Sequence, residues 1–122
     1  MNIVLIGLGA ILGALSRYFI SMFMNQNVLT GGFPYGTFIV NLVGAFTIGL
    51  FLAFSQKYNW DIKITLFVVV GFLGSFTTFS AYIFELATYL KQGFYTIALQ
   101  YFLLSNILGT ILALLAYSLF RK

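Results

Sequence analysis

Cysteine and histidine are both absent from this sequence of 122 residues, and aspartate and glutamate together number only two. Without cysteine there can be no disulfide, thiolate nucleophile or thiol redox chemistry, and without both residues the usual zinc sites are excluded. Two acidic residues supply neither a carboxylate metal cage nor a paired-carboxylate active site from one chain. We therefore do not expect an enzyme.

Charged residues are scarce as well, at 7% of the chain, whereas a soluble domain carries about 25%. Hydrophobic residues make up 61% of the sequence and the mean hydropathy is +1.04, which indicates an integral membrane protein. Six scattered basic residues form no nucleic-acid patch. Because the N-terminal residues lack a basic region and a cleavage site, we expect a retained first helix.

Four hydrophobic segments are each long enough to cross about 30 Å of hydrocarbon. They cover residues 2–24, 35–56, 63–90 and 94–120. Short polar stretches at 25–27, 31–34, 57–63 and 91–93 connect them, so residues 1–122 are predicted to form a single four-helix transmembrane domain.

Basic residues are distributed unequally between the two predicted membrane sides. An even number of spans places both termini on one side, together with the 57–63 loop. That side holds Lys57, Lys63, Arg121 and Lys122, whereas the other side holds Lys91, together with Arg17 about two-thirds of the way along the first span. The positive-inside rule then places both termini in the cytoplasm.

Small residues punctuate every span at about four-residue spacing, which lets membrane helices approach closely. Most are explained by packing within one bundle. Because so small a unit rarely encloses a pore alone, some are expected to face a second chain. They include Gly9, Gly13, Gly44, Gly49, Gly71, Gly74 and Gly109.

The segment from Gly71 to Glu85 is the least typical of a simple membrane span. Its acidic residue would cost about 2.5–3.5 kcal/mol at the centre of an inserted helix, which marks a functional site. Gly74 and the hydroxyls of residues 77, 78 and 80 can bend the backbone locally. A break there would free carbonyls for a small hard cation and turn the ring edges of Phe79 and Tyr82 toward a cavity.

Polar side chains in the other spans leave several interpretations open. Arg17 could snorkel to the interface, pair with Glu85 or attract an anion. Asn41 could join two helices or offer its amide protons to an anion or water. Tyr101 and Ser105 share one helix face as a short ladder of hydroxyls. Neutral donors and ring edges with few acids favour an anion path over a cation path.

The sequence resembles the Fluc (CrcB-type) family of bacterial fluoride channels over essentially its whole length. The resemblance is carried by residues 9–18 of the first span, residues 36–44 of the second and residues 71–85 of the third. It implies an all-α membrane protein with four transmembrane helices, a broken third helix and an antiparallel dimer in the bacterial plasma membrane. Two pathways at the dimer interface would export cytoplasmic fluoride by passive electrodiffusion and confer fluoride resistance.

The resemblance also assigns roles to residues. It implies a structural sodium ion held by the backbone carbonyls of Gly74 and Thr77, and it matches the family's first-helix arginine to Arg17. The fluoride pathway would use an amide, two aromatic ring edges, several hydroxyls and one carboxylate, which correspond to Asn41, Phe79, Tyr82, Ser80, Tyr101, Ser105 and Glu85.

One motif departs from the family pattern, and the distribution of charge bears on assembly. The usual Thr-Thr-Phe-Ser-Thr-Phe becomes Thr-Thr-Phe-Ser-Ala-Tyr at residues 77–82, so the hydroxyl of Tyr82 could occupy the fluoride position or bond to the anion. The charge asymmetry favours a heterodimer with a partner of reversed bias over a homodimer. In that heterodimer the Tyr82-lined pathway could conduct partly or not at all.

Two other functions fit the size of the chain. A small multidrug-type exporter shares its four spans and antiparallel pairing, but it depends on an acidic residue in the first helix, where this chain has Arg17. A non-conducting assembly subunit would use its polar residues only for packing. In that case substitutions at Asn41 and Phe79 would change stability but not flux.

Overall fold

The computed structural model describes residues 1–24 and 28–122. The predicted polar connection at residues 25–27 lies outside the described residues. The described chain is helical and contains four helical stretches long and apolar enough to cross a membrane, which confirms the predicted four-span, all-α architecture.

The first, second and fourth spans are single helices, namely α1 (Asn2–Met24), α2 (Tyr35–Tyr58) and α6 (Tyr95–Phe120). A short 3-10 turn, η1 (Val28–Thr30), precedes α2. The third span is assembled from four consecutive pieces: α3 (Ile62–Thr65), the π-helical η2 (Leu66–Leu73), α4 (Gly74–Phe76) and α5 (Phe79–Gln92).

Local sequence explains where the spans begin and end. The side chain of Asp61 accepts a hydrogen bond from the backbone N–H of Lys63 at 2.8 Å and so caps α3. Gly93 follows α5 with φ of 84°, which places it in the left-handed region that glycine adopts without strain. The N–H of Phe94 then donates to the Tyr89 carbonyl at 2.9 Å, which closes the helix and permits an immediate turn into α6.

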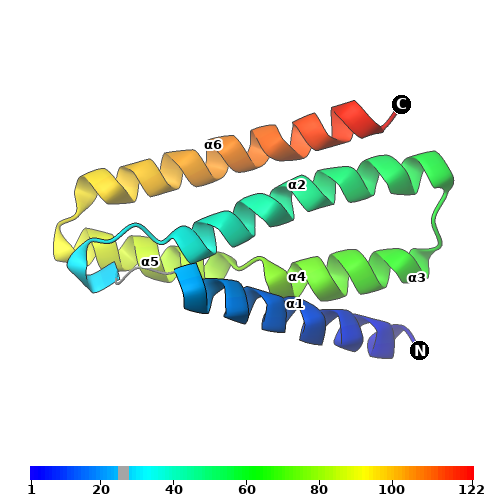
Figure 1. Ribbon diagram of the computed structural model, residues 1–122, viewed down its shortest axis with the longest axis horizontal. Helices are drawn as coiled ribbons and strands as arrows, with labels where there is room; N and C mark the ends of the chain where they lie inside the picture. The colour runs from blue at the N-terminus through cyan, green and yellow to red at the C-terminus, as the bar shows by residue number, and fades with distance from the viewer. Residues whose placement is uncertain (25–27) are drawn as a thin grey trace.

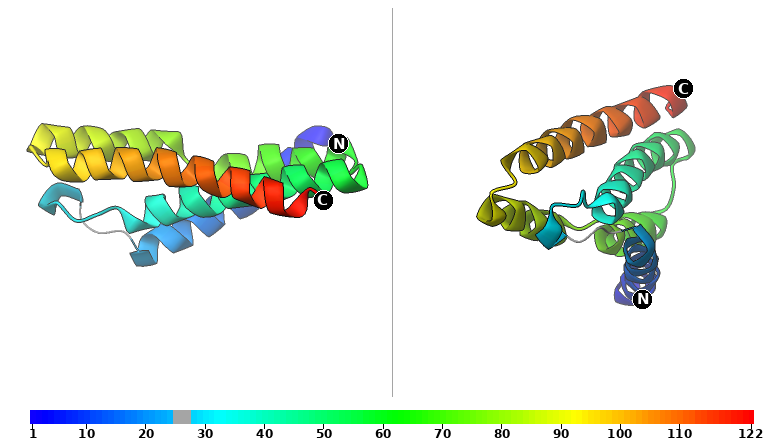
Figure 2. Two further views of the ribbon diagram at one scale, coloured as in Figure 1. Left: turned by 90° about the horizontal axis from the view of Figure 1, so that it is seen from above. Right: turned by 60° about the vertical axis from the view of Figure 1, so that its left-hand side comes forward.

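The spans run antiparallel in pairs, and Figure 1 shows both termini at the same end as the α2–α3 turn. Helix α2 packs chiefly on α6, and α1 packs on η2 and α4, as the views in Figure 2 also show. Both contacts require small residues. A Cβ added at Gly13 would overlap the Phe72 backbone, and one added at Gly49 would overlap the backbone of Ala113.

A small aromatic core lies at the end of the molecule that holds the α5–α6 turn. Its buried members are Tyr82, Tyr89, Ala98 and Tyr101. The Tyr89 hydroxyl donates to the carbonyl of Gly32, which ties α5 to the segment that leads into α2. Most other large apolar side chains are exposed on the outer faces of the helices, as expected for a protein surrounded by lipid.

Candidate functional site

The polar centre of the molecule is the two-residue segment between α4 and α5. Thr77 and Thr78 both have extended backbone angles, with φ and ψ of −83° and 152° for Thr77 and −145° and 118° for Thr78. The side chain of Thr78 then caps α5 by accepting a hydrogen bond from the N–H of Ala81 at 3.3 Å.

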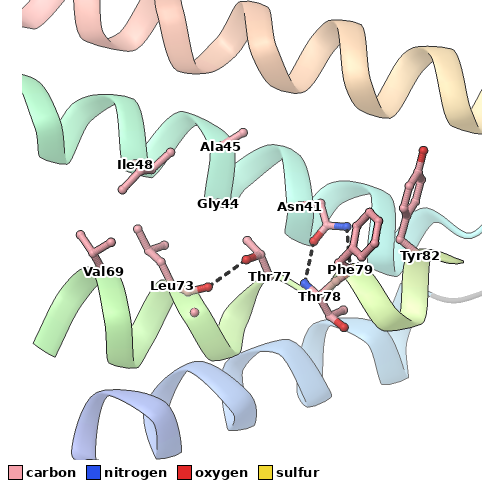
Figure 3. Close-up of a pocket in the computed structure, with 11 residues that line it drawn as sticks. Asn41, Gly44, Ala45, Ile48, Val69, Leu73, Thr77, Thr78, Phe79 and Tyr82 are labelled. Atoms are coloured by element: carbon pink, nitrogen blue, oxygen red, sulfur yellow. Dashed lines mark hydrogen bonds between the residues drawn. The ribbon is translucent and has the colours of Figure 1, made fainter. Parts of the chain in front are cut away.

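Asn41 of α2 holds this extended segment in place (Figure 3). Its Oδ1 accepts from the Thr78 N–H at 3.0 Å, and its Nδ2 donates to the Thr78 carbonyl at 3.4 Å. The amide therefore joins two helices, and one of its two amide protons is not needed for this pairing. Gly44 lies one turn along α2, where an added Cβ would overlap the Thr77 methyl group, so the two segments are also in close apolar contact.

The extended segment redirects the hydrogen bonds that a continuous helix would make. In such a helix the N–H of Thr78 would donate to the Gly74 carbonyl, and the N–H of Ala81 would donate to the Thr77 carbonyl. These donors go instead to Asn41 and to the Thr78 side chain. The carbonyls of Gly74 and Thr77 are thus released from their usual helical donors.

Arg17 meets a third carbonyl of the same turn. Its Nε donates to the Ser75 carbonyl at 3.0 Å, so a guanidinium of α1 satisfies the carboxyl end of α4. The alternative in which Arg17 pairs with Glu85 is wrong in this chain. The two Glu85 oxygens accept instead from Thr37 and Tyr101, because the helix rotation brings hydroxyls to the carboxylate.

Glu85 lies in a buried cluster on the inner face of α5. Thr37 Oγ1 donates to Glu85 Oε1 at 2.6 Å, and the Tyr101 hydroxyl donates to Oε2 at 2.7 Å. Glu85 is 6% exposed and Tyr101 0%, so two hydroxyl donors hold a buried carboxylate. Thr37 was not among the residues predicted to line the site. Its position one turn before Asn41 on α2 is the sequence signal that could have found it.

A cavity of about 460 Å³ lies between α2 and the third span (Figure 3). It brings together five of the residues predicted from the sequence, whereas the other predicted residues lie outside its lining. Those in the lining are Asn41, Gly74, Thr77, Phe79 and Tyr82.

The two aromatic residues of the cavity differ in exposure. Phe79 is 75% exposed, and Tyr82 is only 7% exposed. Their ring centroids lie 6.0 Å apart, and the Tyr82 ring meets the Tyr101 ring edge-to-face at 5.0 Å. The Tyr82 hydroxyl accepts a hydrogen bond from Asn106 Nδ2 at 3.0 Å. Asn106 was not among the residues assigned to the pathway, since a contact between α5 and α6 depends on how the two helices are rotated.

The remaining predicted hydroxyls lie beside this centre. The Oγ of Ser80 is 3.3 Å from the Thr78 hydroxyl. The Oγ of Ser105 is buried and, among the described residues, has no hydrogen-bond partner. Ser105 follows Tyr101 by one turn of α6, so their shared face carries one engaged hydroxyl and one unengaged hydroxyl.

This arrangement can bind small ions in two ways. Amide and hydroxyl protons and aromatic ring edges suit an anion, and the released carbonyls suit a hard cation. In residues 1–24 and 28–122, no three His, Cys, Asp or Glu side chains gather into a possible metal site. A cation at this centre would therefore be held by neutral oxygens, among them the released carbonyls.

Comparison with known proteins gives concordant matches over nearly the whole chain. The family model described as "CrcB-like protein, Camphor Resistance (CrcB)" matches residues 4–117. A Bacteroides fragilis protein named "Fluoride-specific ion channel FluC" is 40% identical over 117 residues, which cover 94% of this chain and 91% of the relative. Relatives of the same name from Campylobacter lari and Koribacter versatilis are 40% and 39% identical, over 94% and 96% of this chain and 90% and 93% of theirs.

Proposed function

The chain belongs to the CrcB family, and we propose that it forms a fluoride-specific ion channel that exports cytoplasmic fluoride across a bacterial plasma membrane. The relatives' name supports fluoride as the ion that the channel conducts, and the four apolar spans support a membrane location. The observation that carries the proposal is the cavity where Asn41, Phe79 and Tyr82 meet at the extended Thr77–Thr78 segment. A passive channel of this kind needs no turnover chemistry, so the protein is not an enzyme.

The proposed pathway follows donors and ring edges from the cavity toward α6. Asn41 supplies an amide proton beyond its pairing with Thr78, and Phe79 and Tyr82 supply the positive edges of their rings. Ser80 and Ser105 continue the path with hydroxyls, whereas the Tyr101 hydroxyl donates its proton to Glu85 and lines the path without donating to the anion. A larger and softer anion cannot satisfy all these closely spaced groups at once, which gives selectivity.

The driving force is the fluoride gradient itself. Fluoride enters a cell as the neutral weak acid and dissociates in the less acidic cytoplasm, where the anion is trapped. The channel lets that anion leave by electrodiffusion, which confers fluoride resistance. Arg17 lies beside the pathway with its guanidinium on the Ser75 carbonyl, so its charge both supports α4 and contributes positive potential for an anion.

A second chain completes the pathway in this proposal. The exposed Phe79 ring lines only one side of the cavity, so a neighbouring chain in antiparallel orientation would supply the facing wall. The excess of basic residues at the end that holds both termini supports cytoplasmic termini and a heterodimer with a partner of reversed bias. In a heterodimer this chain could conduct partly or serve as a non-conducting subunit.

A structural sodium ion fits the released carbonyls of the third span. Gly74 and Thr77 would supply backbone oxygens, the ligand type that hard cations prefer. The fit rests on the diversion of the Thr78 and Ala81 N–H groups to Asn41 and the Thr78 side chain. Gly74 is exposed on the single chain, so backbone carbonyls of a second chain could complete the coordination in a dimer.

The test is fluoride efflux from liposomes that contain the purified chain, read with a fluoride electrode, with chloride efflux as the control. We expect rapid loss of fluoride and retention of chloride from the assembly that conducts. If the chain alone is silent, co-reconstitution with its partner chain separates a heterodimeric channel from a structural subunit. Well-folded protein that conducts no fluoride in either assembly would contradict the proposal.

A further inference from the structure

The contact between Tyr82 of α5 and Asn106 of α6 has no role in the pathway described so far. Resting on the proposed function, we propose that Asn106 is a positioning residue for fluoride passage. By donating to the Tyr82 phenol oxygen, Asn106 fixes the ring and leaves the phenol proton as a donor for the anion.

Two aromatic contacts hold the Tyr82 ring in addition to its hydrogen bond with Asn106. Its edge-to-face contact with Tyr101 has a centroid distance of 5.0 Å, and its tilted contact with Phe79 has a distance of 6.0 Å. Figure 3 shows the hydroxyl pointing away from the Asn41 side of the cavity and toward α6. The ring can therefore line the cavity although its hydroxyl group is larger than the hydrogen of phenylalanine.

The orientation of the Asn106 amide follows from its second partner. Nδ2 donates to the carbonyl of Phe102 at 2.8 Å as well as to the Tyr82 hydroxyl at 3.0 Å. A carbonyl can only accept, so the NH₂ group must face it, and the two amide protons serve these two bonds. The phenol oxygen is consequently the acceptor in its bond to Asn106.

That direction decides what Tyr82 can offer to an ion. A phenol that accepts one hydrogen bond still has its own proton to donate, and that proton must point away from the Asn106 NH₂ group. A bond donated to the oxygen also polarises the O–H group and makes it a better donor. Tyr82 thus combines a ring edge with a directed hydroxyl proton, where phenylalanine would offer the edge alone.

The inference predicts a specific dependence between two side chains. Asn106→Leu, which keeps the approximate size of the side chain, should slow fluoride efflux about three- to tenfold, the effect of one hydrogen bond. In the Tyr82→Phe background the same substitution should have no effect, because there is no hydroxyl to position. Thr110→Val is the matched control, since Thr110 bonds only its own helix, at the Asn106 carbonyl, one turn along α6.

These four variants and the wild type are compared by initial efflux rate per folded protein, in whichever assembly conducts. An Asn106→Leu rate equal to wild type, or an equal slowing in the Tyr82→Phe background, overturns the inference while wild-type efflux upholds the proposed function. If the wild type conducts in no assembly, the proposed function fails, and the inference fails with it.

A readout independent of flux is the ¹³Cζ resonance of tyrosine in labelled protein, with the Tyr82 signal identified by its loss in Tyr82→Phe. We expect Asn106→Leu to shift this signal and Thr110→Val to leave it in place. Sodium fluoride should shift it in the wild type and sodium chloride should not. A signal that Asn106→Leu leaves unmoved overturns the inference even if the protein conducts.

Discussion

Asn41 binds the backbone of Thr78 through both polar atoms of its side chain, accepting from the N–H at 3.0 Å and donating to the carbonyl at 3.4 Å. One amide on α2 thus replaces the helical partners of a residue in another span. The extended backbone at residues 77–78 and the release of the Gly74 carbonyl both accompany this single contact.

Replacement of Asn41 by leucine should affect both stability and flux. The two bonds to Thr78 would be lost, and the extended segment would be left with unpaired backbone groups inside the membrane. We expect a loss of about 1–2 kcal/mol in the free energy of unfolding and a large fall in fluoride efflux. Denaturation of detergent-solubilised protein and the liposome assay measure the two effects.

The matched control for Asn41 is Thr47→Val, on the same helix. The Thr47 hydroxyl donates only to the Val43 carbonyl of its own helix, at 2.7 Å. The Thr47→Val substitution should therefore leave fluoride efflux unchanged. Normal flux in Asn41→Leu would show that the amide only joins the helices.

Arg17 should not be replaceable by lysine. The guanidinium Nε reaches the Ser75 carbonyl from α1 with a planar donor, and an ammonium group cannot reproduce that geometry. We expect Arg17→Lys and Arg17→Gln to lower stability by about 1.5–3 kcal/mol, as for a hydrogen bond to a charged group. If Arg17→Lys instead matches the wild type while Arg17→Gln loses fluoride efflux, the charge matters and the contact with Ser75 does not.

The close approach of α2 to Thr77 gives a rescue experiment. Gly44→Ala should destabilise the protein, because its Cβ would overlap the Thr77 methyl group. Thr77→Ser removes that methyl and keeps the hydroxyl that donates to the Leu73 carbonyl at 2.9 Å. The double variant should regain most of the melting temperature lost by Gly44→Ala. A double variant that melts no higher than Gly44→Ala would refute the contact.

Substitution of Ser105 should affect fluoride efflux and stability differently. Its Oγ is buried and has no hydrogen-bond partner among the described residues, so it brings a desolvation cost without a matching bond. We therefore expect Ser105→Ala to leave stability unchanged or slightly raised while fluoride efflux falls. Thr110→Val, which removes a hydroxyl one turn farther along α6, should not slow efflux. Efflux unchanged in Ser105→Ala would remove the residue from the proposed pathway.

The four spans could be predicted because lipid requires long apolar segments, and each is present in the fold. The structure also places Asn41 and residues 74, 77, 79 and 82, each named as a candidate from the sequence, around one cavity.

Partners across helices could not be predicted. Thr37 with Glu85 and Asn106 with Tyr82 depend on helix rotation and on which spans are neighbours, and neither follows from spacing within one helix. The alternative in which Arg17 pairs with Glu85 is wrong for the same reason. Arg17 faces the Ser75 carbonyl, and Glu85 faces the Tyr101 hydroxyl.

The most direct test of the account is fluoride efflux by the wild type and by Phe79→Leu, with chloride as the control anion. Phe79 is 75% exposed in the single chain, so its loss should leave the chain folded and remove a ring edge from the pathway. In the assembly that conducts, with or without the partner chain, the account predicts rapid efflux of fluoride but not chloride by the wild type, and slow efflux by an equally folded Phe79→Leu. Equal rates for the two proteins, or equal release of the two anions, would contradict it.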